Sequence, residues 1–243
     1  MYRLLLTILC AVVFCASTEV PEFIHLCKIN DPEFIECIKK SAEALKPIFA
    51  KGAPDYNIPS LEPLIMDELI SEQSGGLHIT AKNVKAYGAS NYFFKDLKID
   101  MDSQRYDIDV ELPNLGIEAD YGVDGKVILV PIRGSGPMTA NVTDILAKVV
   151  LIGEITEIDG EKHLNFKTMT INVKVGGGSG KLYNLFNGDK VLGDIVNDTI
   201  NKNFDAFLKE LLPVIERSLA SVFLKIANSI VSPYTFAQLF PEN

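Results

Sequence analysis

The sequence is poor in the residues that enzymes use to hold metals or to attack substrates. It contains no tryptophan, four cysteines and three histidines among 243 residues. His25, His78 and His163 lie far apart, and none has a second ligand at metal-binding spacing. Neither a C-x-x-C pair nor a G-x-S-x-G motif is present. We therefore predict a protein that is not an enzyme and that needs neither a metal nor a cofactor.

Two further patterns resemble catalytic motifs only in part. Residues 176–181 (GGGSGK) lack the spacing of a phosphate-binding loop, because Val175 stands where the first glycine is required and Leu182 where Ser or Thr is. We interpret this glycine-rich run as a flexible connection. Acidic residues alternate at positions 107, 109 and 111. They fall on the polar face of a predicted strand, where surface acids are ordinary, so we do not interpret them as catalytic.

Positive charge is also scarce. The chain has 23 Lys and Arg against 32 Asp and Glu, which gives a net charge of −9 at pH 7. Nucleic acids and anionic membrane surfaces bind proteins through clustered Lys and Arg side chains. The composition therefore argues against both classes of partner.

Long hydrophobic runs are confined to the beginning of the chain. Arg3 is followed by an apolar run from Leu4 to Phe14 and then by small residues. This pattern is typical of a secretory signal peptide and is too short to span a bilayer. We predict a signal peptide over residues 1–17 and a single domain over residues 18–243, secreted to the extracellular space without stable membrane insertion.

Removal of that signal peptide would leave one pair of cysteines. Cys10 and Cys15 would be cleaved off, and Cys27 and Cys37 would remain. An even pair in a secreted chain predicts one disulfide bond, and two buried free thiols are the alternative.

Apolar residues recur in steps of three and four over residues 189–231, which predicts one long helix. The stripe consists of Leu192, Val196, Ile200, Phe204, Phe207, Leu211, Ile215, Leu219, Val222, Ile226 and Ile230. Its mean step of about 3.8 residues exceeds the 3.6 residues of a helical turn, so the stripe winds around the helix and requires a surface that curves with it. Pro213 is the only breaker that we recognise, and we expect a kink there. A shorter helix is predicted over residues 31–51, with Asp31 as its N-cap and a kink at Pro47.

From residue 77 to residue 175 the period changes to two. Tyr106, Ile108 and Val110 alternate with acidic residues, as in a sheet with one apolar and one polar face. Asp-Gly pairs at 124–125 and 159–160 predict hairpin turns. The apolar phase changes after residue 166, so we expect a bulge near residues 167–168. Long antiparallel strands followed by a long helix predict an α+β fold in which the sheet bends around the helix.

Two Asn-x-Thr sequons make the chain a candidate glycoprotein. They begin at Asn141 and Asn197. Asn141 falls on the polar face of a predicted strand, and Asn197 falls on the polar side of the predicted long helix. Both asparagines are therefore candidate glycosylation sites.

Three segments carry a resemblance to a known family. The first is the pair Cys27 and Cys37, the second is residues 185–194 (LFNGDKVLGD) running into residues 201–204 (NKNF), and the third is residues 233–241 (PYTFAQLFP). Together they resemble the insect takeout and juvenile-hormone-binding proteins over essentially the whole predicted mature chain. Haemolymph hormone carriers of this family typically have a second disulfide. This chain has no cysteine after Cys37, which favours the takeout branch.

The resemblance implies both a fold and a function. The implied fold is a long helix wrapped by a strongly curved antiparallel sheet, like one module of the tubular lipid-binding superfamily, with an internal apolar tunnel. The implied function is a secreted carrier, in haemolymph or another extracellular fluid, of an elongated hydrophobic small molecule. Terpenoids such as juvenile hormone and fatty acid derivatives both fit this description. The resemblance is also compatible with a further partner, an unidentified protein receptor.

A carrier of this type needs a mostly apolar site with few polar groups. The candidates on the apolar faces of the predicted strand and helix are Tyr106, Ile108, Val110, Phe204, Phe207, Leu211 and Ile215. Ordinary core packing would explain each of these residues as well. A structural or interaction protein with a filled core, acting at a partner or lipid surface, is therefore the alternative from another functional class.

Overall fold

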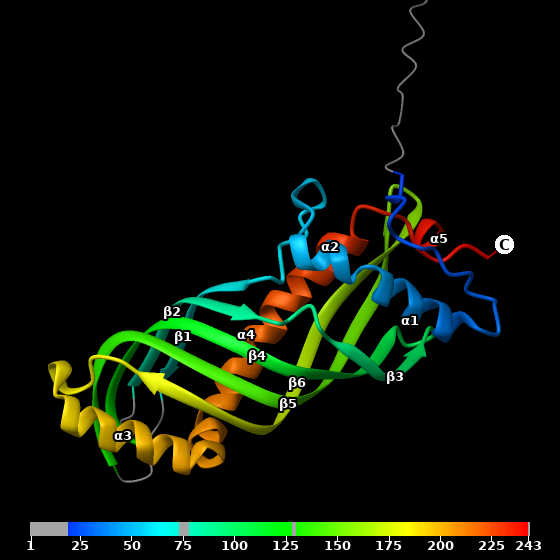
Figure 1. Cartoon of the computed structure of the whole chain (residues 1–243). Coiled ribbons are helices and arrows are strands. Elements are labelled where there is room, and N and C mark those ends of the chain that lie inside the picture. Colours follow the sequence, from blue (N-terminus) through cyan, green and yellow to red (C-terminus); the bar gives the residue numbers. More distant parts are fainter. Residues whose placement is uncertain (1–18, 73–77, 128–129, 243) are drawn as a thin grey trace, which may run out of the picture.

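The structure is a computed structural model that describes residues 19–72, 78–127 and 130–242 (Figure 1). The predicted signal peptide lies outside the described residues. In chain order the elements are α1 (Phe34–Ala44), α2 (Lys46–Lys51), η1 (Pro54–Tyr56), β1 (Leu64–Glu72), β2 (His78–Tyr87), β3 (Phe93–Asp100), β4 (Arg105–Val127), β5 (Val130–Ile158), β6 (Glu161–Leu182), η2 (Phe186–Gly188), α3 (Lys190–Lys202), α4 (Phe204–Val231) and α5 (Phe236–Leu239).

The strands form one antiparallel sheet in the order β1-β2-β4-β5-β6, and β3 pairs with the first part of β4. β4, β5 and β6 are 23, 29 and 22 residues long. At about 3.3 Å per residue the shortest of them would extend for roughly 70 Å if it were straight. The sheet instead curls around α4, which crosses its concave side (Figure 1). The predicted α+β fold, with a long helix wrapped by a curved sheet, is therefore confirmed, although the sheet begins at Leu64 and not at residue 77.

Two of the local strand predictions are confirmed and one is wrong. Asp159 and Gly160 form the β5–β6 turn, both with positive φ, between the paired residues Ile158 and Glu161. The bulge falls at Lys167, because Ile152 pairs with Thr168 while Gly153 pairs with Phe166. The pair at 124–125 is not a turn, since the β4–β5 ladder continues beyond it to residues 127 and 130.

The glycine-rich run at 176–181 is not a flexible connection. It belongs to β6 and pairs with β5, for example Gly178 with Val142. A Cβ atom at Gly178 would lie 2.6 Å from ring carbons of Phe204 and 2.7 Å from the carbonyl oxygen of Asn141. Glycine at this position therefore allows an aromatic side chain of α4 to lie directly against the strand backbone.

The predicted single helix over residues 189–231 is wrong in one respect. The chain leaves helical geometry at Asn203, with φ −123° and ψ 35°, and this residue separates α3 from α4. The Asn203 side chain donates a hydrogen bond to the carbonyl oxygen of Thr199, at 2.8 Å. This local hydrogen bond supports the end of α3. Pro213 does not end a helix, because α4 continues through it.

The N-terminal helix is also divided. α1 ends at Ala44 and α2 begins at Lys46, so Pro47 lies in the first turn of a new helix and not at a kink. Asp31 is not the N-cap, which is Glu33, but its carboxylate accepts a hydrogen bond from the Glu33 backbone N–H at 2.8 Å. The predicted disulfide bond between residues 27 and 37 is present and joins the N-terminal arm to α1.

Candidate ligand-binding interior

The apolar side of α4 faces the sheet but is not closed off by it. Within α4, all of which the structure describes, Ile226 is the only buried residue. A helix packed against a filled core would bury a continuous stripe at helical spacing. The apolar side chains of the long helix therefore remain partly accessible.

Buried side chains gather in three separate clusters. The cluster beside α3 contains Tyr121, Val123, Ile132, Leu185, Val196 and Ile200. The cluster beside β1 and β2 contains Leu61, Leu64, Ala86 and Ala89. The cluster beside the C-terminal end of α4 contains Tyr106, Leu151, Leu164 and Phe166. Small domains commonly have one contiguous core. Here the part of α4 between Phe207 and Leu219 is contacted by none of the three clusters.

The predicted site residues divide between these clusters and the space between them. Tyr106 belongs to the C-terminal cluster, Ile108 packs against it, and Phe207 packs against the α3 cluster. The remaining four residues are partly buried, and none of the three clusters includes them; they are Val110, Phe204, Leu211 and Ile215. Along α4, residues 211 and 215 fall between Phe207 and Leu219, which packs against the β1–β2 cluster. Their contact with a ligand stays a prediction.

The buried phenols next to these clusters already have hydrogen-bond partners. The Tyr106 hydroxyl donates to Oε1 of Gln104 at 2.9 Å, and the Tyr121 hydroxyl donates to the Tyr183 carbonyl oxygen at 2.6 Å. Burial raises the pKa of both phenols, so they stay neutral at physiological pH. These tyrosines contribute apolar ring surface and no charge.

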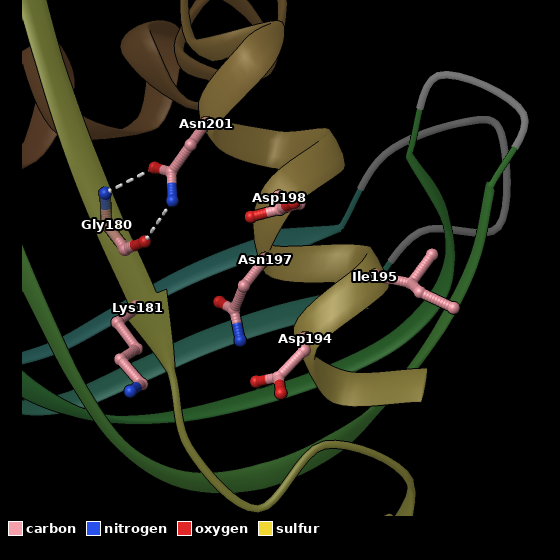
Figure 2. Close-up of a pocket in the computed structure, with 7 residues that line it drawn as sticks. All are labelled: Gly180, Lys181, Asp194, Ile195, Asn197, Asp198 and Asn201. Atoms are coloured by element: carbon pink, nitrogen blue, oxygen red, sulfur yellow. Dashed lines mark hydrogen bonds between the residues drawn. The ribbon is translucent and has the colours of Figure 1, made fainter. Parts of the chain in front are cut away.

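Side chains of the helices close the free edge of β6. The amides of Asn197, Asn201 and Asn228 each accept from a strand N–H and donate to the carbonyl oxygen of the same strand residue. Their partners are Leu182, Gly180 and Phe166, at distances of 2.8–2.9 Å, and Figure 2 shows the Asn201–Gly180 pair. The Glu216 carboxylate accepts from the Val173 N–H at 2.8 Å. An edge strand needs such partners because its backbone groups are otherwise unpaired.

The sequence does not predict this edge pairing. It places Asn197 on the polar side of the predicted long helix, whereas in the structure the Asn197 amide contacts the strand. Asn197 and Asn201 are four residues apart and therefore share one helix face, which is the one signal the sequence offers. Asn228 gives no such signal, because its partner is 62 residues away in the chain.

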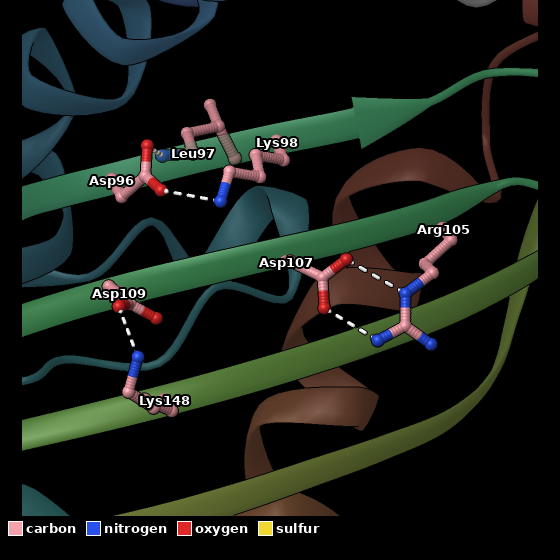
Figure 3. A network of polar contacts seen from close by, with 7 residues as sticks. All are labelled: Asp96, Leu97, Lys98, Arg105, Asp107, Asp109 and Lys148. Atoms are coloured by element: carbon pink, nitrogen blue, oxygen red, sulfur yellow. Dashed lines mark hydrogen bonds and ion pairs between the residues drawn. The ribbon is translucent and has the colours of Figure 1, made fainter.

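The convex face of the sheet has a different chemistry. Three exposed ion pairs lie on it: Lys148 with Asp109 at 2.6 Å, Arg105 with Asp107 at 2.7 Å, and Lys98 with Asp96 at 3.2 Å (Figure 3). The side-chain hydrogen bond from Arg105 holds the pKa of the Asp107 carboxyl below its usual value. An ionised carboxylate with an arginine partner is a poor general acid at neutral pH. The face has the polar character that the alternation predicts.

Two surface hollows are lined by residues of the helices. A groove of about 620 Å³ lies between residues 51–60 and the part of α4 that carries Val222, Lys225, Ile226 and Ser229. A second hollow, of about 470 Å³, lies between β6 and α3 and is lined by Lys181, Asp194 and Asp198 among others (Figure 2). Neither of these two hollows is lined by a predicted ligand-contact residue, although the candidate glycosylation site Asn197 lines the second. Among the described residues, no group of three or more His, Cys, Asp or Glu side chains is arranged to hold a metal ion. Within the same ranges, no helix has the length and apolarity needed to cross a membrane.

Comparison with known proteins gives consistent matches over nearly the whole chain. The circadian clock-controlled protein daywake of Drosophila melanogaster is 27% identical over 241 residues, which cover 93% of this chain and 90% of daywake. A putative beta-carotene-binding protein of Schistocerca gregaria is 22% identical, with 87% of this chain and 86% of that protein covered.

A solved structure shows the same architecture. The crystal structure of Takeout 1 from Epiphyas postvittana superposes with a TM-score of 0.79 and 25% sequence identity, covering 89% of this chain and 99% of Takeout 1. Residues 4–241 match the family described as haemolymph juvenile hormone binding protein. The chain therefore belongs to this insect family of takeout and juvenile hormone binding proteins.

Proposed function

We propose that the protein is a carrier that encloses an elongated hydrophobic small molecule between α4 and the concave face of the sheet. The observation that carries this proposal is the apolar side of α4, which lies under the sheet and buries only Ile226. Leaving so much apolar surface accessible inside a fold forfeits about 25 cal/mol per Å². A bound apolar ligand that covers this surface would recover that free energy.

Family membership supports a hydrophobic ligand. The family is described by juvenile hormone binding, and one relative carries the name of a putative beta-carotene-binding protein. Both are long, largely apolar molecules. We propose that residues inside, beside and between the packed clusters contact such a ligand along its length: Tyr106, Ile108 and Val110 from β4, and Phe204, Phe207, Leu211 and Ile215 from α4. A terpenoid or a fatty acid derivative fits this lining, and we propose no catalytic step.

We also propose that the carrier works outside the cell. The disulfide bond between Cys27 and Cys37 suits an oxidising compartment. The pattern of residues 1–17 suits a cleaved signal peptide, which would leave a single domain over residues 18–243. Haemolymph or another extracellular fluid is then the expected location. An unidentified protein receptor there would be a further partner, which takes up the ligand.

The test is to extract the purified protein with organic solvent and to identify released lipids by mass spectrometry. Displacement of N-phenyl-1-naphthylamine, a neutral apolar fluorophore, by long-chain terpenoids and fatty acid esters measures binding directly. A carrier should release at least one apolar compound or bind the fluorophore with one saturable site. Protein that releases no lipid and binds no fluorophore would support the alternative, a structural or interaction protein with a filled core.

A further inference from the structure

The two sequons occupy different environments in the folded chain. Asn141 lies on β5, where it is exposed, while its neighbour Val142 is buried on the other face. Successive side chains of a strand point to opposite faces, so Asn141 projects from the convex side of the sheet. Its partners on the adjacent strands are Gly116 and Ser179. A Cβ atom added at Gly116 would meet nothing within 4 Å, so the space beside Asn141 is open.

Asn197 has no such freedom. Its Oδ1 accepts from the Leu182 N–H at 2.8 Å, and its Nδ2 donates to the carbonyl oxygens of Leu182 at 2.9 Å and Gly193 at 3.0 Å. Both hydrogens of the amide nitrogen are therefore used within the fold. A sugar on this nitrogen would replace one of them and would stand between α3 and the edge of β6.

We infer that the two sequons have opposite roles: Asn141 carries an N-linked glycan in the secreted protein, whereas Asn197 stays unmodified and joins α3 to the edge of β6. The inference rests on the extracellular part of the proposed function, because the modification takes place in the secretory pathway. It does not depend on whether the protein carries a ligand.

The modification requires a nucleophilic amide nitrogen and an activated sugar. Nδ2 of Asn141 forms a bond to the first sugar carbon of an oligosaccharide linked to a lipid pyrophosphate. The bond between that carbon and the phosphate oxygen breaks, the lipid pyrophosphate leaves, and the amide loses one proton. No oxidation or reduction is involved. The Asn-Val-Thr sequence supplies the acceptor sequon.

Position on the convex face determines what the glycan would do. Asn141 lies near the middle of β5, and its alternation with the buried Val142 places it on the convex side of the sheet. A hydrated oligosaccharide there would cover exposed sheet surface without reaching the concave interior. It would therefore leave ligand binding unchanged and keep this face from docking against another protein.

The experiment uses full-length protein secreted from insect cells, treated with peptide N-glycosidase and analysed by gel mobility and peptide mass spectrometry. Thr143→Val and Thr199→Val each destroy one sequon while both asparagines stay in place. Thr143→Val should abolish the mobility shift, and Thr199→Val should leave it unchanged. If the natural signal peptide fails to direct export, a heterologous secretory leader fused before residue 18 gives the same readout.

A second variant tests the role of Asn197 separately. Asn197→Leu removes the amide, so it should lower the melting temperature and keep the glycan on Asn141. A glycosylated Asn197 peptide in the folded secreted protein, or an unmodified Asn141 peptide, would overturn the inference. Lipid extraction of the same material reports on the carrier proposal, so each idea can fail without the other.

Discussion

The two faces of this one sheet are built from alternate residues of the same strands, yet their side chains differ in polarity and in what they contact. On the convex face, charged side chains such as Lys148 and Asp109 meet partners on neighbouring strands. On the concave face, apolar side chains meet in three separate clusters, and α4 remains partly accessible between them. A period of two along each strand is sufficient to produce both faces.

The two faces differ in how much they stabilise the fold and in how much apolar surface they leave accessible to a ligand. The convex face adds solubility and little stability, because exposed ion pairs contribute at most about 1 kcal/mol each. The clusters on the concave face hold the sheet to the helices, and the surface between them is free for another molecule. Variants in each region should therefore respond differently to an apolar ligand.

The largest loss of stability is expected from a substitution within a packed cluster. Leu164 is only 1% exposed, so Leu164→Ala should lower the free energy of unfolding by about 2–5 kcal/mol because it creates a closed cavity. Denaturant unfolding with and without N-phenyl-1-naphthylamine should give the same loss. A loss that disappears when the fluorophore is present would mean that the ligand reaches Leu164 itself.

A smaller and ligand-dependent effect is expected at Phe207. This residue is partly buried at the edge of the α3 cluster, so Phe207→Ala should cost no more than about 3 kcal/mol. If a ligand occupies adjacent space, it can fill part of the new cavity, and the loss should shrink when N-phenyl-1-naphthylamine is bound. Melting curves with and without the fluorophore measure this difference.

The control for that measurement lies on the other face of the sheet. Asp109→Asn should leave binding of the fluorophore unchanged, since its side chain pairs with Lys148 on the convex surface. An equal loss for Phe207→Ala under both conditions, with unchanged affinity, would assign Phe207 to ordinary core packing.

A substitution at the edge of β6, where helix side chains pair with the strand, should cause an intermediate loss of stability. Asn228→Ala leaves the Phe166 N–H and carbonyl groups without their side-chain partner, so it should lower stability by about 1–3 kcal/mol. Hydrogen exchange at the Phe166 amide should accelerate as well. Ser229→Ala is the matched control, because the Ser229 hydroxyl bonds only within its own helix, to Lys225. Equal behaviour of the two variants would contradict a role for Asn228 in closing the edge.

The smallest effect is expected from the ion pair of Asp107 and Arg105. Because the pKa of the folded Asp107 carboxyl lies below the ordinary value of 3.8, the pair stabilises the protein above that value and loses its effect as the pH falls through the lowered pKa. The Asp107→Asn variant should therefore have a slightly lower melting temperature than the wild type at neutral pH and the same melting temperature in strong acid. Melting curves recorded across that pH range test the sign.

Local sequence signals predicted most of the strand architecture. The alternation around Tyr106, the Asp-Gly pair at 159–160 and the phase change near residue 167 each depend on neighbouring residues alone. For the same reason the sequence misplaced features that depend on distant contacts. The apolar period runs unbroken through Asn203, although the side chain of this residue ends α3.

The glycine-rich run and the edge asparagines show the same limit. A run of glycines is typical of a loop, and the requirement for Gly178 becomes visible only when Phe204 lies against it. Polar residues on a helix are typical of a solvent-facing side, and the role of Asn228 becomes visible only beside β6. Periodicity assigns the candidate ligand contacts to the apolar faces of their elements, but it does not distinguish a residue that packs from one that lines a space.

The division of the interior into three clusters has a consequence for how such a protein can change over evolutionary time. A protein with one continuous core must repack it when a central side chain is replaced. Here, residues such as Val110, Leu211 and Ile215 lie outside the clusters that hold the elements together. Under the proposed function, mutations at these positions would alter the length or width of the ligand that fits at little cost to folding, so that one scaffold could diversify to bind chemically distinct molecules.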